Sequence, residues 1–252
     1  MNDFHVHTCF CDGKNSPEEM ILAAIKLHMG KIGLVYHSYV PFDEECCIKK
    51  GNETAFCDEI DRLREKYHGK IEIFKGVEKD YFSDTADSGC DYVIGSVHYI
   101  KIGGEYFSVD ESAENFKALA ENKFGGDYYA LAKEYFQLVS HVVGKTGADI
   151  IGHFDLVSKF NEGGRFFDEN NDRYKECAYR AIEDLVQYGV PFEINTGAVS
   201  RGYRKTPYPG EDLIRKIASL GGKFILSSDA HSAENLCFGF GDIRINNICE
   251  TF

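Results

Sequence analysis

The sequence contains no continuous apolar run of 18 residues, which is close to the shortest length that a helix needs to cross a bilayer. The N-terminus also lacks the basic segment and the apolar segment that mark a secretory signal peptide. We therefore expect neither membrane insertion nor export, no membrane partner, and a cytoplasmic protein.

Signatures of covalent catalysis are absent as well. There is no Gly-rich phosphate loop and no GxSxG serine motif, and neither cysteine of the CFC stretch has the CxxxxxR spacing of a phosphocysteine phosphatase.

The nine cysteines include the vicinal pair Cys46 and Cys47 but form no CxxC, which argues against a disulfide framework and against a zinc ribbon.

Basic residues are outnumbered by acidic ones. The chain has 28 Lys and Arg against 41 Asp and Glu, for a net charge of -13. This excess repels a polyanion unless metal ions or a local basic patch reverse the field. We therefore do not expect nucleic acid as a partner.

Short β-branched runs alternate along the chain with amphipathic stretches. At 252 residues and 43% hydrophobic content the chain can bury one large core, and we find no linker, so we expect a single domain over residues 1–252. The pattern predicts helices at 16–28, 54–67, 127–145, 173–189 and 211–221, the first with Ser16 as its cap and Pro17 at its first position. The predicted strands are 2–7, 32–38, 71–78, 92–100, 149–157, 191–196 and 223–231.

Seven apolar strands separated by helices indicate an α/β fold with a parallel sheet covered on its faces, and this number of units can close into a barrel. Residues 101–126 break the alternation and are expected to be an insertion or a lid.

Six histidines and two carboxylates fall at or just beyond the C-terminal ends of different predicted strands. They are His5, His7, His37, His98, His153 and His231, with Glu78 and Asp229. Strand ends converge on one face of a parallel barrel, and side chains two residues apart on a strand share a face. A single histidine at a strand end is ordinarily a satisfied polar residue, but six are hard to explain that way. His28, His68 and His141 lie in or beside helices and are expected to be surface or core residues.

Imidazoles and carboxylates suit zinc, manganese or iron, and this set is too large for one tetrahedral ion. We expect two to three divalent transition-metal ions. Such a cluster lowers the pKa of a bridging water and polarises a phosphoryl oxygen, so hydrolysis by a metal-bound hydroxide is the expected reaction class. Glu78, Asp229 and His231 are the residues that we expect to act in catalysis, with Glu78 bridging two ions.

These motifs resemble the polymerase and histidinol phosphatase (PHP) family of metal-dependent phosphoesterases over essentially the whole chain. The motifs occur in the family's order as HVHTCFCDG, YHS, GVE, GSVH, GHFD and SDAH. The resemblance implies a distorted seven-stranded (β/α)7 barrel with three ions. By position it assigns one ion to His5, His7, Glu78 and Asp229, a second to Glu78, His98 and His153, and a third to Asp12, His37 and His231.

The chain departs from the family's pattern in two places. Asp12 followed by Gly13 stands where some phosphatase members have histidine, and Tyr36 precedes His37 where many members have aspartate. Oxygen ligands favour manganese or iron over zinc more than imidazole does, so the first departure leaves the identity of the third ion open.

Within the family, the chain is similar to the histidinol-phosphate phosphatase branch of histidine biosynthesis. The resemblance points to Lys159 and Arg201 as phosphate contacts, with Arg165, Arg204 and Lys205 nearby. Asn195 or Glu193 could reach the amine or imidazole of the substrate, or could hydrogen-bond within the core. An imidazole pocket could be walled by Phe160, Tyr203 and Tyr208.

The reaction expected from this resemblance is hydrolysis of the small phosphate monoester L-histidinol phosphate to L-histidinol and phosphate. Two alternatives stay open. One is a PHP phosphodiesterase or phosphatase acting on nucleotides or oligonucleotides, and the other is a noncatalytic PHP interaction module.

Overall fold

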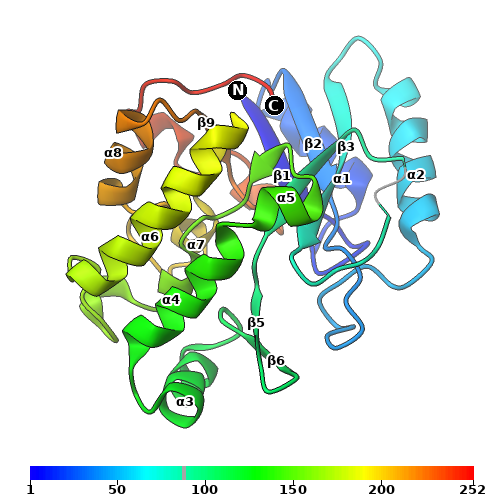
Figure 1. Ribbon diagram of the computed structural model, residues 1–252. Coiled ribbons are helices and arrows are strands. Elements are labelled where there is room, and N and C mark those ends of the chain that lie inside the picture. The colour runs from blue at the N-terminus through cyan, green and yellow to red at the C-terminus, as the bar shows by residue number, and fades with distance from the viewer. Residues whose placement is uncertain (87–88) are drawn as a thin grey trace.

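The computed structural model describes residues 1–86 and 89–252, with helices arranged around a parallel sheet (Figure 1). The main-sheet strands are β1 (Asn2–His7), β2 (Lys31–Val35), β3 (Glu72–Asp80), β4 (Tyr92–Ser96), β7 (Ile150–Ile151), β8 (Phe192–Asn195) and β9 (Phe224–Ser227). The α-helices are α1 (Pro17–Lys26), α2 (Glu53–Lys66), α3 (Ala113–Phe124), α4 (Tyr128–Val139), α5 (Val142–Thr146), α6 (Asp172–Leu185), α7 (Gly197–Ser200) and α8 (Glu211–Ser219).

The main sheet is parallel and nearly closed. In the described part of the chain its seven strands lie in the order β1-β2-β3-β4-β7-β8-β9, and every neighbouring pair is parallel. Beyond β9, the amide of His7 donates to the carbonyl of Ala230 (2.9 Å) and the amide of Ala230 donates to that of His5 (3.2 Å). These bonds join the last strand to the first, and the predicted (β/α)7 barrel is confirmed.

One end of the barrel interior is filled by aromatic and branched side chains. Tyr92 lies in this cluster with Phe4, and its hydroxyl donates to the carbonyl of Phe4. A Cβ placed on Gly33 would lie 2.2 Å from the Tyr92 hydroxyl oxygen, and one on Gly76 would lie 2.3 Å from Cζ of the ring, so glycine at these two positions makes room for the Tyr92 side chain. The chain's last residue, Phe252, stacks on Tyr92 with ring centroids 4.5 Å apart, which brings the two termini to the same end of the molecule (Figure 1).

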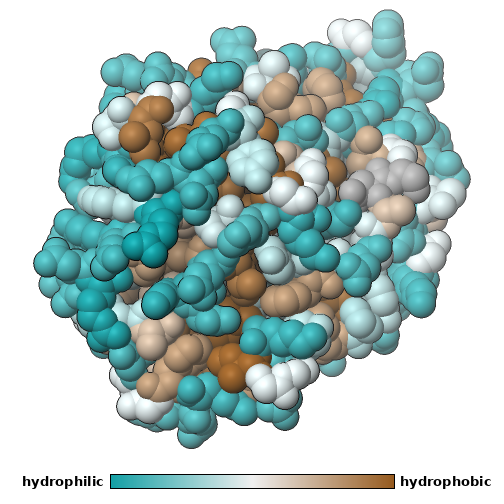
Figure 2. Space-filling view, in the orientation of Figure 1, coloured by the Kyte–Doolittle hydropathy of each residue, from teal (hydrophilic) through white to brown (hydrophobic). Residues whose placement is uncertain are grey.

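Local sequence signals place the helices. Ser16 accepts a hydrogen bond from the Glu19 amide while the Glu19 carboxylate accepts one from the Ser16 amide, so the predicted cap of α1 is a complete capping box. Of this helix, Met20, Ile21 and Ala24 are buried against the sheet side. Hydrophilic side chains cover most of the face in Figure 2, in keeping with the high charge of the chain.

Several predicted elements differ from the structure. The predicted strands 32–38 and 223–231 end early, at Val35 and Ser227. Residues 127–145 form two helices, α4 and α5, because the side chains of Ser140 (2.9 Å) and His141 (2.7 Å) both bond the carbonyl of Gln137 where the helix would continue. The predicted strand 92–100 ends at Ser96. The predicted strand 149–157 is regular only over Ile150–Ile151 and continues into a short 3-10 turn, Leu156–Ser158.

The segment 101–126 breaks the alternation as expected. Strand β5 (Tyr99–Ile102) pairs in antiparallel fashion with β6 (Glu105–Ser108), and α3 follows. The ring of Phe42 stacks on that of Tyr106 with centroids 3.8 Å apart, and the Tyr99 hydroxyl donates to Asp43 (2.7 Å). This hairpin therefore packs against the loop that follows β2, next to the carboxyl ends of the strands.

Candidate metal site

The structure brings all nine predicted ligands to the carboxyl end of the barrel. Most of them stand at strand ends, but Asp12 reaches the cluster from the loop after β1. That loop turns sharply, with the amides of Cys11 and Gly13 both donating to the carbonyl of Thr8 (3.1 Å each). A Cβ on Gly13 would lie 2.6 Å from the Thr8 amide nitrogen. Glycine at this position therefore permits the turn that carries Asp12 inward.

The first ligand group comprises His5, His7, Asp229 and Glu78. The Nε2 atoms of His5 and His7 are 3.0 Å apart, and they lie 3.2 and 3.3 Å from Glu78 Oε2. Asp229 Oδ1 is 3.9 Å from His5 Nε2 and 3.6 Å from His7 Nε2. The backbone of Asp229 is left-handed, with φ of 50°, a conformation that Asp tolerates better than most residues and that often marks functional sites.

The second ligand group gathers on the other oxygen of Glu78. His153 Nε2 lies 2.9 Å and His98 Nε2 3.2 Å from Glu78 Oε1. The hydroxyl of Ser96, at the end of β4, donates to this same oxygen (2.7 Å). Glu78 therefore stands between the first and second groups, as a carboxylate shared by two ions would.

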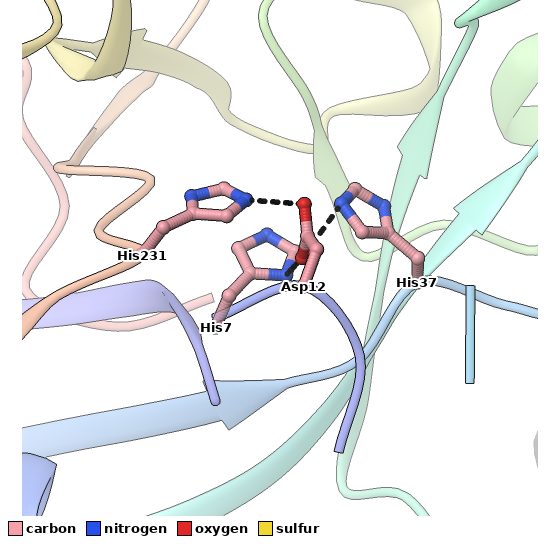
Figure 3. Close-up of side chains that lie close together, drawn as sticks. All are labelled: His7, Asp12, His37 and His231. Carbon is pink, nitrogen blue, oxygen red and sulfur yellow. Dashed lines mark hydrogen bonds and ion pairs between the residues drawn. The ribbon is translucent and has the colours of Figure 1, made fainter. Parts of the chain in front are cut away.

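The third ligand group surrounds Asp12 (Figure 3). His231 Nε2 lies 3.0 Å from Asp12 Oδ2, and His37 Nε2 lies 3.6 Å from Asp12 Oδ1. His7 contributes to this group through its other nitrogen, because Nδ1 lies 3.7 Å from Asp12 Oδ1. His37 in turn reaches Glu78 Oε2 through Nδ1, at 2.9 Å, so the three groups form one continuous cluster.

The donor set fits divalent cations. Glu78 Oε2 is buried and makes no hydrogen bond, although nitrogens of His5, His7 and His37 lie within 3.3 Å of it. Two imidazole nitrogens that face each other at 3.0 Å, as in His5 and His7, also require a proton or a cation between or beside them. Closely spaced nitrogen and oxygen ligands of this kind are those that zinc, manganese and iron accept.

Electrostatics keeps the carboxylates of the cluster ionised. Burial disfavours the charge on Glu78, but the rings of His5, His37 and His98 outweigh burial and hold its pKa well below the usual range. Asp229 is likewise buried, and Arg201 with His5 holds its pKa below the usual range. The cluster therefore offers permanently charged oxygen ligands at neutral pH.

The imidazoles of the cluster differ in the direction in which their pKa is shifted. Burial and the neighbouring rings of His231 and His37 lower the pKa of His7 to about 3, so His7 is neutral and ready to ligate a cation. Burial also disfavours the charged form of His5, but Glu193, Glu78 and Asp229 outweigh it and raise the pKa of His5 well above its ordinary value. A cation that binds at His5 has to displace a proton.

Two buried carboxylates that orient ligands lie behind the cluster. Glu193 Oε1 lies 2.6 Å from His5 Nδ1. Asp80 Oδ2 accepts from the His98 amide (3.0 Å) and lies 3.3 Å from His98 Nδ1. Asp80 was not predicted from the sequence, although its position two residues after Glu78 on β3 places both side chains on one face.

A cavity of about 360 Å³ opens above the ligands, and both predicted phosphate contacts, Lys159 and Arg201, line it. Lys159 Nζ donates to the carbonyl of Asp110 (2.8 Å) and pairs with its carboxylate (3.0 Å). Arg201 Nη2 pairs with Asp229 Oδ2 (3.0 Å), and its Nη1 lies 3.0 Å from His231 Nδ1. Both cations are therefore held beside the cluster by carboxylates.

The other basic candidates lie away from the cavity wall. Arg204 is buried and donates to the carbonyl of Ser158 (3.0 Å). The exposed Lys205 lies 3.7 Å from Glu162, and the exposed Arg165 stacks over the ring of Phe166. These contacts do not favour a direct role in phosphate binding.

Asn195 is fully buried behind the ligands. Its Nδ2 donates to Glu193 Oε2 (3.0 Å) and its Oδ1 accepts from the Gly197 amide (2.9 Å). Both ends of the amide are thus engaged within the protein, which favours the core hydrogen-bonding alternative for Asn195 over substrate contact.

The aromatic candidates are divided between wall and core. Tyr203 lines the cavity, and Phe160 packs against it with ring centroids 5.4 Å apart. Tyr208 is buried beside His153. The three histidines expected to be structural, His28, His68 and His141, are exposed and lie outside the cluster.

Comparison with known proteins places this geometry in a family. Residues 3–197 match the model of the PHP domain family. The chain is 29% identical over 256 aligned residues to the Deinococcus radiodurans protein named "Probable histidinol-phosphatase", covering 95% of this chain and 90% of that protein.

Two crystal structures share the fold. A Listeria monocytogenes protein superposes with a TM-score of 0.84 at 21% identity, covering 97% of this chain and 100% of that one. Histidinol phosphate phosphatase from Lactococcus lactis, solved with zinc, L-histidinol and phosphate, superposes with a TM-score of 0.71 at 22% identity, covering 100% of this chain and 96% of that one. No helix within the described residues is both long and apolar enough to span a membrane. Because the family model matches most of this chain, the chain belongs to the PHP domain family.

Proposed function

We propose that this protein is a metal-dependent phosphoric monoester hydrolase that converts L-histidinol phosphate to L-histidinol and phosphate, within a single domain of residues 1–252. The observation that carries the proposal is the position of Glu78, whose two oxygens face two ligand groups directly beneath a cavity lined by Lys159 and Arg201. The named histidinol-phosphatase relative and the Lactococcus structure with histidinol and phosphate support this choice of substrate.

The nine ligands are proposed to hold two to three divalent ions, of zinc, manganese or iron. His5, His7, Asp229 and Glu78 would hold one, Glu78, His98 and His153 a second, and Asp12, His37 and His231 a third. When bound, these ions would activate water and draw negative charge from the phosphoryl oxygens. Zinc in the Lactococcus structure supports that metal, and the carboxylate of Asp12 suits manganese or iron.

The protein's own residues would bind and orient the phosphate. Lys159 and Arg201 lie on the cavity wall, and each is partly neutralised by one carboxylate, Asp110 or Asp229. A monoester dianion that enters the cavity would add charge-assisted hydrogen bonds to these two groups. Asp229 is ionised at neutral pH, so it serves as a ligand and hydrogen-bond acceptor and not as a proton donor.

The cavity favours a small monoester over the alternatives. Its volume of about 360 Å³ is near the lower end of ligand sites, and its lining includes Asp43 of the loop after β2 and Asp110. A diester would need space for a second substituent on phosphorus. We propose a small-molecule substrate and no nucleic-acid partner, and the complete set of candidate ligands argues against a noncatalytic module.

All nine thiols of the chain are free in the structure, as is usual for proteins of a reducing compartment. We therefore propose a cytoplasmic location for this enzyme, where it would contribute to histidine biosynthesis.

The direct test is phosphate release from L-histidinol phosphate by the purified protein. Activity should disappear after treatment with a chelator and return on addition of Mn²⁺ or Zn²⁺. Phosphate release that is unchanged after the removal of all bound metal would contradict the proposal.

A further inference from the structure

A single carboxylate at the end of the barrel receives hydrogen bonds from three directions. Glu193 lies on β8 and is completely buried. Its Oε1 lies 2.6 Å from His5 Nδ1. Its Oε2 accepts from the backbone amide of His153 (3.0 Å) and from Nδ2 of Asn195 (3.0 Å). Within the described residues, Glu193 does not line the cavity.

The contact with His5 sets the orientation of that ring. An ionised carboxylate only accepts hydrogen bonds, so the 2.6 Å contact places a proton on His5 Nδ1. The opposite nitrogen, Nε2, is then directed at His7 Nε2 (3.0 Å) and Glu78 Oε2 (3.2 Å). Glu193 thus presents His5 to the first ligand group in the tautomer that a ligand needs.

The contact with His153 acts on the second ligand group. Only the backbone of His153 is bound by Glu193, while its Nε2 reaches Glu78 Oε1 at 2.9 Å. Glu193, His5, Glu78 and His153 therefore form a closed ring of contacts that crosses three strands and the segment after β7. In this ring Glu193 and Glu78 are connected in two ways, on one side through His5 of the first ligand group and on the other through His153 of the second.

We propose that Glu193 is a positioning residue that fixes the separation of the first and second ion sites by tying the imidazole of His5 to the backbone of His153. The inference rests on the proposal that these groups hold divalent ions, but it does not depend on the identity of the substrate. Outer partners of this kind typically contribute about 10- to 100-fold to metal affinity.

The three donors explain why a carboxylate is required here. Glutamine has nearly the same shape, but its amide offers one acceptor oxygen and one NH₂ group. If the oxygen of a glutamine accepted from His5, its NH₂ group would face two further donors, the His153 amide and the Asn195 amide group. Glu193→Gln should therefore disturb both ion sites without removing any ligand.

The test is metal affinity in Glu193→Gln, measured by competition of Mn²⁺ and Zn²⁺ with a chromophoric chelator in the absence of substrate. We expect both ions to bind about 10- to 100-fold more weakly than in the wild-type protein, and the visible spectrum of the Co²⁺-loaded protein to change. Excess Mn²⁺ should restore part of the activity.

Asn161→Asp provides a matched control. Asn161 is also buried, and its amide bonds Glu169 and the backbone of residues 166 and 167, outside the ligand cluster. The control exchanges the same two functional groups in the opposite direction. It should lower stability at most and leave metal affinity unchanged.

Wild-type affinity for both ions in a folded Glu193→Gln would overturn the proposal. If that variant does not fold, Glu193→Asp decides the question, because it keeps the charge but withdraws it by one methylene from His5. Weaker metal binding in Glu193→Asp supports the positioning role, and wild-type affinity overturns it. Loss of folding in both variants while Asn161→Asp folds would also overturn it, in favour of a purely structural role. A protein that binds metal as expected but does not hydrolyse histidinol phosphate would contradict only the proposed function.

Discussion

Arg201 Nη2 lies 3.0 Å from Asp229 Oδ2, whereas the other oxygen of that carboxylate, Oδ1, faces His5 and His7. A cation of the cavity wall and a candidate metal ligand are therefore joined directly. This contact places a fixed positive charge beside the cluster, where the phosphate of a monoester would bind.

Removal of that charge should weaken the binding of the phosphate in both ground and transition states. A charge-assisted hydrogen bond contributes on the order of 1.5 to 3 kcal/mol, so Arg201→Ala should lower kcat/KM for histidinol phosphate by roughly 10- to 150-fold and raise KM. Metal content should be retained because Asp229 still faces His5 and His7. Lys205→Ala, which alters an exposed lysine near Glu162, is the control and should leave the kinetics unchanged.

Glu78→Ala should be among the most damaging substitutions. It removes both oxygens that the first and second ligand groups share and leaves two cation sites without the charge between them. We expect loss of at least one ion per chain by elemental analysis, and an activity loss greater than the roughly 100-fold cost of an outer-shell partner. Glu72→Gln, at the exposed start of the same strand, should have no such effect. A variant at position 78 that keeps its metals and its rate would contradict the bridging role.

Alanine substitutions of histidines inside and outside the cluster should differ clearly in their effect on activity. His98→Ala and His153→Ala remove nitrogens within 3.2 Å of Glu78 Oε1 and should lose most of the activity. His28→Ala and His68→Ala alter exposed rings and should change stability by no more than about 0.5 kcal/mol. Parallel assays and thermal unfolding distinguish the two classes, and equal losses in all four variants would indicate general instability instead.

The metal-free protein should become less stable at alkaline pH. Burial disfavours the charged ring of His98, but Glu78 and Asp80 outweigh burial and raise its pKa to about 10 from the ordinary value of 6.5. Since the folded-state pKa is the higher one, the protonated ring stabilises the fold fully below pH 6.5, and this contribution is lost as the pH rises toward 10.

Urea unfolding in the presence of a chelator measures this effect. The free energy of unfolding should fall between about pH 7 and pH 10, and it should fall less steeply in His98→Asn. Identical pH profiles for the two proteins would show that His98 is not the titrating group.

Much of the fold and of the cluster follows from short-range sequence patterns. Alternating strands and helices predict a parallel barrel, and a parallel barrel brings strand ends together. His5, His37 and His231 could therefore be grouped from their positions alone. The grouping did not require any knowledge of the inter-strand register.

The contact of Glu193 with His5 could not be predicted, because it joins distant segments of the chain. The link from Glu193 to His5 spans 188 positions, and no local pattern distinguishes a carboxylate that orients an imidazole from one that binds a substrate amine. The hairpin β5–β6, in contrast, could have been predicted, because its sequence carries a local turn signal. Gly103 and Gly104 separate two short β-prone runs, which is a characteristic hairpin pattern.

We propose that the cavity selects a phosphate monoester. The most direct measurement is the ratio of kcat/KM for L-histidinol phosphate to that for bis(p-nitrophenyl) phosphate, with the same Mn²⁺-loaded protein. The cations Lys159 and Arg201 and the small cavity predict a ratio far above one, because a monoester dianion carries more charge and only one substituent. A higher kcat/KM for the diester, or for dinucleotides, would contradict the proposed function.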